Sequence, residues 1–192
     1  MNDALETVIV VDRDDTPIRS AGKLDVHFDG TLHRAFSVFG FNKAGEMLIQ
    51  KRAECKYHSP GLWANTCCGH PRPGEATLNA AVRRTREELG IQVTLRPAFQ
   101  TCYKADVGRG LIEHEFVHAY SFVVNDLPRP NPYEISEVNF LPLKAIVQDV
   151  KKCASSYASW FKFYVENHLE DIIQMSKTEG SLTLREDDWC GC

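Results

Sequence analysis

The segment from Gly69 to Gly90 constrains the fold of this 192-residue chain more than any other stretch. Apolar and small side chains recur through it at intervals of three and four residues: Leu78, Ala81, Val82, Thr85 and Leu89. This spacing places them on one face of a helix, and Gly90 ends the pattern because glycine readily adopts the left-handed conformation found at helix C-termini. The sequence therefore predicts an amphipathic helix over Glu75–Leu89 that packs against a core.

Charged side chains on the same segment follow a regular spacing. In chain order, after Gly69, they are Glu75, Arg83, Glu87 and Glu88. This spacing resembles the Nudix box, a loop–helix–loop that presents carboxylates to a metal-bound diphosphate. The box has a glutamate directly after its arginine, whereas this chain has Arg84 there. The loss of a metal-binding carboxylate, together with a thiol gained at Cys68, suggests a scaffold that has been turned away from hydrolysis.

The bulk composition indicates one globular domain. Hydrophobic residues make up 43% of the chain and charged residues 25%, which is ordinary for a globular protein. The net charge of −4 argues against a general nucleic-acid binder, and no run approaches the roughly 18 apolar residues that a membrane-spanning helix needs. The acidic segment Met1–Glu6 lacks the basic start and apolar core of a secretory signal, so we expect a cytoplasmic protein.

Seven cysteines cannot all pair within one chain, and free thiols are expected in a reducing compartment. We interpret Cys55, Cys102 and Cys153 as small buried or half-buried side chains. The segment Cys190-Gly191-Cys192 is too short for a structural zinc site, because such a site needs four converging ligands.

The remaining pattern predicts a mixed α+β domain in which strands outnumber helices. Short β-branched, aromatic or alternating runs predict strands over Thr7–Asp12, His33–Phe41, Met47–Lys51, Ala98–Tyr103, Ile112–Val124 and Val138–Leu141. Further helices are predicted over Leu143–Val150 and Ser156–Met175, with a structured loop over Lys56–Pro73. We expect a single domain over residues 1–175 and a polar, loosely ordered tail over residues 176–192.

Two carboxylates on one predicted strand, Glu113 and Glu115, form a second functional signal. Side chains alternate across a strand, so both project from the same face, where they repel each other if they are half-buried. A metal ion beside them removes this conflict because it stabilises their charged forms. The alternative is an ordinary solvated strand face, although the apolar neighbours Ile112, Phe116 and Val117 favour a site.

Histidines near the N-terminus are further candidate metal ligands. His27 and His33 flank a possible turn at Asp29-Gly30, and neutral imidazole is a common ligand for zinc or manganese. Taken singly, each is more often a surface or core residue. We assign no function to four other histidines: His58, His114, His118 and His168.

Basic residues occur in the predicted loops and on the Glu75–Leu89 helix: Lys23, Arg52, Lys56 and Arg84. Any one of them can be a plain surface charge. Arg84 lies one helical turn before Glu88, where the pair can form an ordinary contact on the helix face. Arg84 can equally bind a diphosphate oxygen while Glu88 binds its magnesium ion, and the sequence alone leaves both possibilities open.

Taken together, these segments resemble the type I isopentenyl-diphosphate isomerases, a branch of the Nudix-like fold. The likeness rests on six blocks: Lys23–His33, Arg52–Lys56, Asn65–Pro71, Arg83–Gly90, Tyr103–Glu115 and Ser159-Trp160. It implies a Nudix-like mixed sheet flanked by helices. It also implies an enzyme that converts isopentenyl diphosphate reversibly to dimethylallyl diphosphate by protonation and deprotonation, through a carbocation.

The same resemblance implies a role for each group of residues. A zinc or manganese ion would be bound by three imidazoles and two carboxylates: His27, His33, His70, Glu113 and Glu115. Glu88 would bind a magnesium ion that arrives with the substrate diphosphate. The diphosphate would be held by Lys23, Arg52, Lys56, Arg84 and the backbone near Gly69. Cys68 and Glu115 would be the acid–base pair, Tyr103 would orient Glu115, and Trp160 would line the hydrocarbon pocket.

The partner implied by this resemblance is a small isoprenoid diphosphate, with no nucleic acid and no membrane, bound by a monomer or a weak homodimer. Two other interpretations compete with it. A Nudix pyrophosphohydrolase would explain the charged residues of the box but not Cys68 or the pair Glu113 and Glu115. A metal-stabilised binding module would explain the metal ligands but gives no reason for a thiol beside them.

Overall fold

The structure, a computed structural model, describes residues 6–180 of the chain and their side chains up to residue 177. Within this part, nine strands form one mixed sheet: β1 (Thr7–Val11), β2 (Pro17–Gly22), β3 (His33–Phe41), β4 (Met47–Arg52), β5 (Trp63–Ala64), β6 (Cys67–Gly69), β7 (Arg96–Gly108), β8 (Leu111–Val123) and β9 (Ile135–Leu141). The helices are α1 (Lys23–Asp29), α2 (Thr77–Leu89), α3 (Leu143–Lys152), η2 (Ala154–Ser156), α4 (Ser159–Asn167) and α5 (Leu169–Gly180). The predicted α+β class, a mixed sheet flanked by helices, is confirmed.

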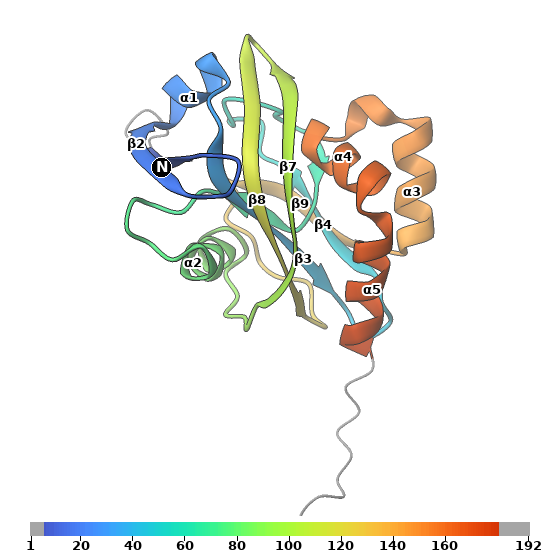
Figure 1. Ribbon diagram of the computed structural model, residues 1–192. Coiled ribbons are helices and arrows are strands. Elements are labelled where there is room, and N and C mark those ends of the chain that lie inside the picture. The colour runs from blue at the N-terminus through green and yellow to red at the C-terminus, as the bar shows by residue number, and fades with distance from the viewer. Residues whose placement is uncertain (1–5, 181–192) are drawn as a thin grey trace, which may run out of the picture.

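Helices cover both faces of this sheet, as Figure 1 shows. Side chains of β3 alternate between the two faces, so the strand contributes to two separate apolar layers. Phe36 and Val38 pack with the small face of α2 at Ala80 and Ala81. On the other side, the odd-numbered residues of β3 pack with α3, α4 and α5, where Phe39 contacts Tyr164 edge-on. The sheet is therefore the middle layer of a three-layer domain.

β3 organises the sheet because it pairs with four other strands. β8 runs parallel to it along its whole length, in a register that pairs His33 with Glu115. On its opposite edge β1, β6 and β4 follow one another, and β6 pairs Ser37 with Cys68. β7 then lies on the far side of β8 and pairs Tyr103 with Glu115. The register of three strand pairs thus gathers five chemically active side chains into one region.

α2 differs from the predicted helix in its start and in its buried face. It begins at Thr77 rather than Glu75 and ends at Gly90, whose φ of 71° is the predicted left-handed cap. Leu78, expected in the apolar stripe, is 38% exposed, whereas Arg84 and Glu88 are buried. Part of the inward face is therefore charged, and charged groups are tolerated there because they are paired.

Several other predictions about local structure are wrong. Lys23–Asp29 is a helix that ends at Gly30 with φ 65°, where only a turn was expected. The predicted loop over Lys56–Pro73 contains the short strands β5 and β6. Cys55 and Cys102 both lie exposed at the protein surface and are not buried or half-buried. Cys55 Sγ donates to the Tyr133 backbone carbonyl. None of these differences changes the class of the fold.

The predicted helix Ser156–Met175 is divided into η2, α4 and α5. The first break occurs because Ala158 donates its N–H to the Trp63 carbonyl, which ties the chain to β5. α5 continues to Gly180, so the first residues of the predicted tail are helical, and residues 181–192 lie outside the described part. Among the described helices, none combines the length and the apolar character that crossing a membrane requires.

Gly40 of β3 gives a direct test of how tightly the two apolar layers meet. A Cβ atom at this position would lie 2.8 Å from Phe122 Cζ, closer than real contacts allow, and 3.2 Å from Thr66 Cγ2, which is a tight contact. We predict that Gly40→Ala lowers the free energy of unfolding by about 1–3 kcal/mol, as overpacking does in other cores, measured by urea denaturation. Phe122→Leu in the same background should restore part of the loss. Strictly additive losses would contradict the predicted clash.

Candidate active site

A cavity of about 450 Å³ lies where α1, α2, α4 and the central strands meet. The predicted catalytic and diphosphate-binding residues all line it: Cys68, Tyr103, Glu115, Trp160, Lys23, Arg52, Lys56, Gly69 and Arg84. The predicted metal ligands His70, Glu88 and Glu113 line it as well. His27 and His33 are fully buried beside it. Residues from segments far apart in the sequence are therefore brought together in one place.

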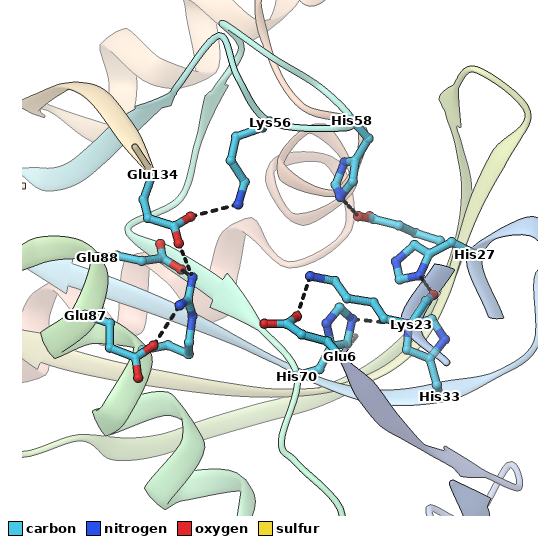
Figure 2. A network of polar contacts seen from close by, with 12 residues as sticks. Glu6, Lys23, His27, His33, Lys56, His58, His70, Glu87, Glu88 and Glu134 are labelled. Atoms are coloured by element: carbon cyan, nitrogen blue, oxygen red, sulfur yellow. Dashed lines mark hydrogen bonds and ion pairs between the residues drawn. The ribbon is translucent and has the colours of Figure 1, made fainter. Parts of the chain in front are cut away.

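Three imidazoles converge on one carboxylate at the edge of this cavity. Ligand atoms of His27, His33, His70 and Glu115 all lie within 4.8 Å of one another. Figure 2 shows the three imidazoles side by side. His70 Nε2 is 2.9 Å from Glu115 Oε1 and only 3.2 Å from His33 Nε2. Two ring nitrogens at that separation repel if both present lone pairs, and a divalent cation between them relieves the repulsion. The cluster therefore has the chemistry of a metal site.

Backbone carbonyls determine which nitrogen two of these rings turn toward the cluster. His27 Nδ1 is 2.6 Å from the Lys23 carbonyl oxygen, and His33 Nδ1 is 2.8 Å from that of Thr31. Because a carbonyl only accepts, Nδ1–H donates in both rings and the lone pair is left on Nε2. Burial lowers the pKa of His33 to about 3, with the neighbouring His70 adding to the effect. The ring is therefore neutral, which is the form that binds metals.

The five predicted ligands do not form a single group in this geometry. Glu113 lies in a second group, within 4.8 Å of ligand atoms of His27 and His58. His27 is common to both groups. Imidazole nitrogens with carboxylate oxygens suit zinc or manganese, so the donor types fit the ion that the sequence implied. The structure also places His58 beside two of the predicted ligands, His27 and Glu113.

Tyr103 links the two carboxylates of β8. Its hydroxyl oxygen is 2.6 Å from Glu113 Oε2 and 2.8 Å from Glu115 Oε2, so both oxygens compete for one proton. Burial raises the pKa of the Glu113 carboxyl above its ordinary value, and the Glu115 carboxylate beside it adds to the rise. Both glutamates are buried, at 4% and 7% exposure. The repulsion inferred from the alternation of the strand is thus present, and a cation would relieve it.

The two adjacent cysteines of β6 project into different surroundings. Cys67 is fully buried in the apolar layer under α2. Cys68 faces the cavity, where its Sγ donates to Asn65 Oδ1 at 3.1 Å and lies 3.4 Å from Ser37 Oγ. Burial raises the pKa of the Cys68 thiol to about 12, and its hydrogen bonds with Ser37 and Asn65 offset only part of the rise. The thiol in the cavity is therefore protonated at neutral pH.

Asn65 connects this thiol to Trp160. Its side-chain amide donates to the carbonyl oxygens of Val38 and Cys67, which turns Oδ1 toward the cavity. Oδ1 accepts hydrogen bonds from Cys68 Sγ and from Trp160 Nε1, the latter at 3.2 Å. The thiol and the indole are thus held by one buried amide that the sequence alone did not single out.

The cationic side of the cavity is dense with carboxylates, as Figure 2 shows. Arg84 lies 2.6 Å from Glu88, 2.7 Å from Glu87 and 3.1 Å from Glu134. Burial lowers the pKa of Arg84, but Glu88 and the other carboxylates outweigh it and raise the pKa above its ordinary value. Lys56 shares Glu134 at 2.7 Å. The contact between Arg84 and Glu88 on the helix face is therefore present, in a position that also lines the cavity.

Two further basic side chains, Lys23 and Arg52, line the cationic side of the cavity. Lys23 Nζ is 2.8 Å from Glu6 and 5.3 Å from the centre of the Tyr57 ring. The Arg52 guanidinium lies 5.2 Å from the centre of the Trp160 ring, a cation–π arrangement. The diphosphate-binding cations proposed from the sequence thus face the same cavity as the thiol.

Sequence reasoning missed several residues of this site: Glu6, Ser37, His58, Asn65 and Glu134. Single polar residues in loops or strands carry no local pattern, and only the folded chain brings them to the cavity. The other histidines without an assigned function make contacts elsewhere. His114 bonds to the Gly30 carbonyl, His118 to Asp15, and His168 to Asp171 and Thr101.

Comparison with known proteins identifies relatives that share most of this chain. Residues 31–162 match the NUDIX domain family. The isopentenyl-diphosphate Delta-isomerase of Pectobacterium atrosepticum is 42% identical over 177 residues, which cover 92% of this chain and 98% of that protein. The isopentenyl-diphosphate Delta-isomerase of Cereibacter sphaeroides is 48% identical over 155 residues, covering 78% of this chain and 86% of that protein.

Solved structures support the fold. The DR0079 protein from Deinococcus radiodurans superposes with a TM-score of 0.71 at 19% identity, covering 84% of this chain and 98% of that one. The MutT protein from Methanosarcina mazei gives a TM-score of 0.58 at 18% identity, covering 78% and 96%. At these identities the likeness concerns the fold alone.

Proposed function

The chain belongs to the isopentenyl-diphosphate Delta-isomerases, a family built on the NUDIX domain, and we propose that its cavity converts isopentenyl diphosphate to dimethylallyl diphosphate by proton transfer. One observation carries the residue assignment. The protonated thiol of Cys68 and the carboxylate of Glu115 line the same cavity. Glu115 belongs to the group of possible metal ligands, here called the metal-type cluster, that consists of His27, His33, His70 and Glu115. A double-bond shift needs an acid and a base, because one proton must be added at C4 and another removed from C2.

Cys68 and Glu115 are proposed as this acid–base pair. The alkene is not activated, so its protonation produces a tertiary carbocation that no neighbouring heteroatom stabilises. In either direction one of the two groups gives a proton and the other accepts one. Asn65 and Ser37 hold the thiol, and Tyr103 holds the Glu115 carboxylate. A bound zinc or manganese ion would hold the Glu115 carboxylate in place.

Trp160 is proposed to stabilise the carbocation. Its side chain is 3% exposed and its Nε1–H is fixed by Asn65, so the orientation of the ring is set before substrate arrives. A cation over a desolvated indole gains about 2 kcal/mol, which corresponds to roughly thirtyfold in rate. The Arg52 guanidinium already lies over this ring, which supports its ability to hold a cation.

The basic residues on the cationic side of the cavity are proposed to hold the diphosphate. Lys23, Arg52, Lys56 and Arg84 line the cavity, and Glu88 stands beside Arg84 as the proposed ligand of a magnesium ion carried by the substrate. Free diphosphate would be repelled by the carboxylates among these cations, whereas its magnesium complex would not. Anchoring at this end supplies binding energy that positions the reacting carbons.

Arg84 supports isomerisation over hydrolysis. It occupies the place of a metal-binding glutamate in the Nudix box and forms ion pairs with Glu87, Glu88 and Glu134. The Arg84 guanidinium lies among these carboxylates, at the position where a hydrolase would bind its metal ions. The diphosphate is then held but not cleaved.

The test is incubation of the protein with isopentenyl diphosphate and magnesium, followed by product analysis. We expect dimethylallyl diphosphate with no release of inorganic phosphate, and loss of turnover after chelation that manganese or zinc restores. Release of inorganic phosphate without an allylic product would instead support a pyrophosphohydrolase. We also propose that the protein acts as a cytoplasmic monomer, which gel filtration and cell fractionation can check.

A further inference from the structure

His58 lies where three parts of the proposed site meet. Its ring packs edge-on to Trp160, with ring centres 5.7 Å apart and an interplanar angle of 78°. Its Nε2 is 3.7 Å from Glu113 Oε1. Its backbone carbonyl accepts a hydrogen bond from Arg52 Nη2 at 3.2 Å. One residue thus touches the proposed hydrocarbon wall, a proposed metal ligand and a proposed diphosphate cation.

The backbone around His58 is held in an unfavourable conformation. Ser59, the next residue, has φ 47° in the left-handed region, which residues other than glycine seldom adopt. Ser59 is 8% exposed and His58 6%, so the segment is packed and not a free surface turn. Strain of this kind persists only where the surrounding structure enforces it, and it concentrates at functional sites.

The hydrogen-bonding capacity of His58 matches a role beside a metal ligand. Its Nδ1 lies 3.5 Å from the Ser59 hydroxyl, which can donate to it and so leave the ring proton on Nε2. With its proton on Nε2, the His58 ring can donate to Glu113 Oε1. The other carboxylate oxygen, Oε2, accepts from the Tyr103 hydroxyl.

We propose that His58 is a positioning residue that couples the metal centre to the hydrocarbon pocket, orienting Glu113 with Nε2 and Trp160 with its ring edge. The distance of 3.7 Å between His58 Nε2 and Glu113 Oε1 is longer than a hydrogen bond. Contacts of this kind in active sites often shorten to hydrogen-bond length once the substrate is bound. Outer partners of this kind are worth about 10–100-fold in metal affinity. The part of the inference that concerns Glu113 rests only on the proposed metal centre, whereas the part that concerns Trp160 rests also on the proposed reaction.

Three substitutions separate the two functions of this side chain. His58→Phe keeps a ring against Trp160 but removes Nε2. His58→Gln keeps a donor for Glu113 but removes the ring edge, and His58→Ala removes both. The control is His118→Ala, because His118 is a half-buried histidine whose contacts, to Asp15 and Gln100, lie away from the cavity. Thermal unfolding of each metal-free variant establishes that it is folded.

The measurements are the dissociation constant for manganese, on metal-stripped protein without substrate, and kcat and KM at saturating manganese and magnesium. We expect His58→Phe to bind manganese about tenfold or more weakly and, once the metal is saturating, to lose less kcat than His58→Gln. We expect His58→Gln to bind manganese normally and to lose about tenfold or more in kcat, because Trp160 is no longer held. His58→Ala should show both losses.

Two results would overturn the inference. Manganese affinity and kcat equal to those of the unmodified chain in all three variants would remove any role for His58. Parallel losses in His58→Phe and His58→Gln would show a general packing role without coupling. If the metal titrations behave as expected but the chain does not isomerise the substrate, the proposed reaction and the role of His58 toward Trp160 fail, while its role toward Glu113 stands.

Discussion

Cys68→Ala should lower kcat for isomerisation by about 100- to 10,000-fold, the range that a positioned acid or base contributes, while the protein stays folded and binds metal normally. The substitution removes the thiol that faces the cavity and leaves its hydrogen-bond partners Ser37 and Asn65 in place. Cys68 is half-buried, so the loss of one sulfur atom creates little empty volume in the core. The measurement is steady-state kinetics with isopentenyl diphosphate, with circular dichroism as the check on folding.

The control for this experiment is the neighbouring thiol. Cys67→Ala removes the same sulfur atom one residue earlier, in the apolar layer under α2 and away from the cavity. It should reduce stability modestly and leave kcat within about threefold, since volume loss in a core acts on folding more than on chemistry. Full activity in Cys68→Ala, or an equal loss in Cys67→Ala, would exclude Cys68 as a proton-transfer group.

Glu115→Gln should lose activity by about 100- to 10,000-fold even at saturating metal, because an amide cannot accept the proton that the carboxylate exchanges. The shape of the side chain is kept, and the amide oxygen can still accept from Tyr103. Metal affinity should also fall, because Glu115 Oε1 lies 2.9 Å from His70 Nε2 within the metal-type cluster.

Glu113→Gln is the comparison that separates these two effects. Glu113 shares the Tyr103 hydroxyl with Glu115 and is buried to a similar degree, but it has no proposed proton to transfer. It should bind manganese more weakly and recover most of its kcat once manganese is saturating. Equal kcat losses in both variants at saturating metal would argue that Glu115 acts only as a metal ligand.

Much of the fold could be predicted because its signals are local. The period of α2, its C-terminal glycine and the apolar runs of β3 and β8 are readable without knowing what they pack against. The metal ligands and the role of the Cys68 thiol were instead implied by the resemblance to the isopentenyl-diphosphate isomerases, and they stay predictions. Once β3 and β8 pair in their observed register, His33 and Glu115 must be neighbours.

The parts that could not be predicted depend on long-range packing. Leu78 looked like a core residue, but α2 is rotated so that Arg84 and Glu88 are buried against Glu134, which is far away in the sequence. His58 had no motif around it, and only the folded chain brings its ring to Glu113 and Trp160. No periodicity records a contact between two loops, so these positions needed the structure.

The central claim is that the cavity shifts a double bond by exchanging protons with the solvent, without cleaving the diphosphate. The most direct measurement is incubation with isopentenyl diphosphate, magnesium and manganese in deuterated water, followed by NMR and mass spectrometry of the products. The account predicts dimethylallyl diphosphate that carries deuterium in a methyl group and retains both phosphates. Release of inorganic phosphate without an allylic product, or an allylic product free of deuterium, would contradict it.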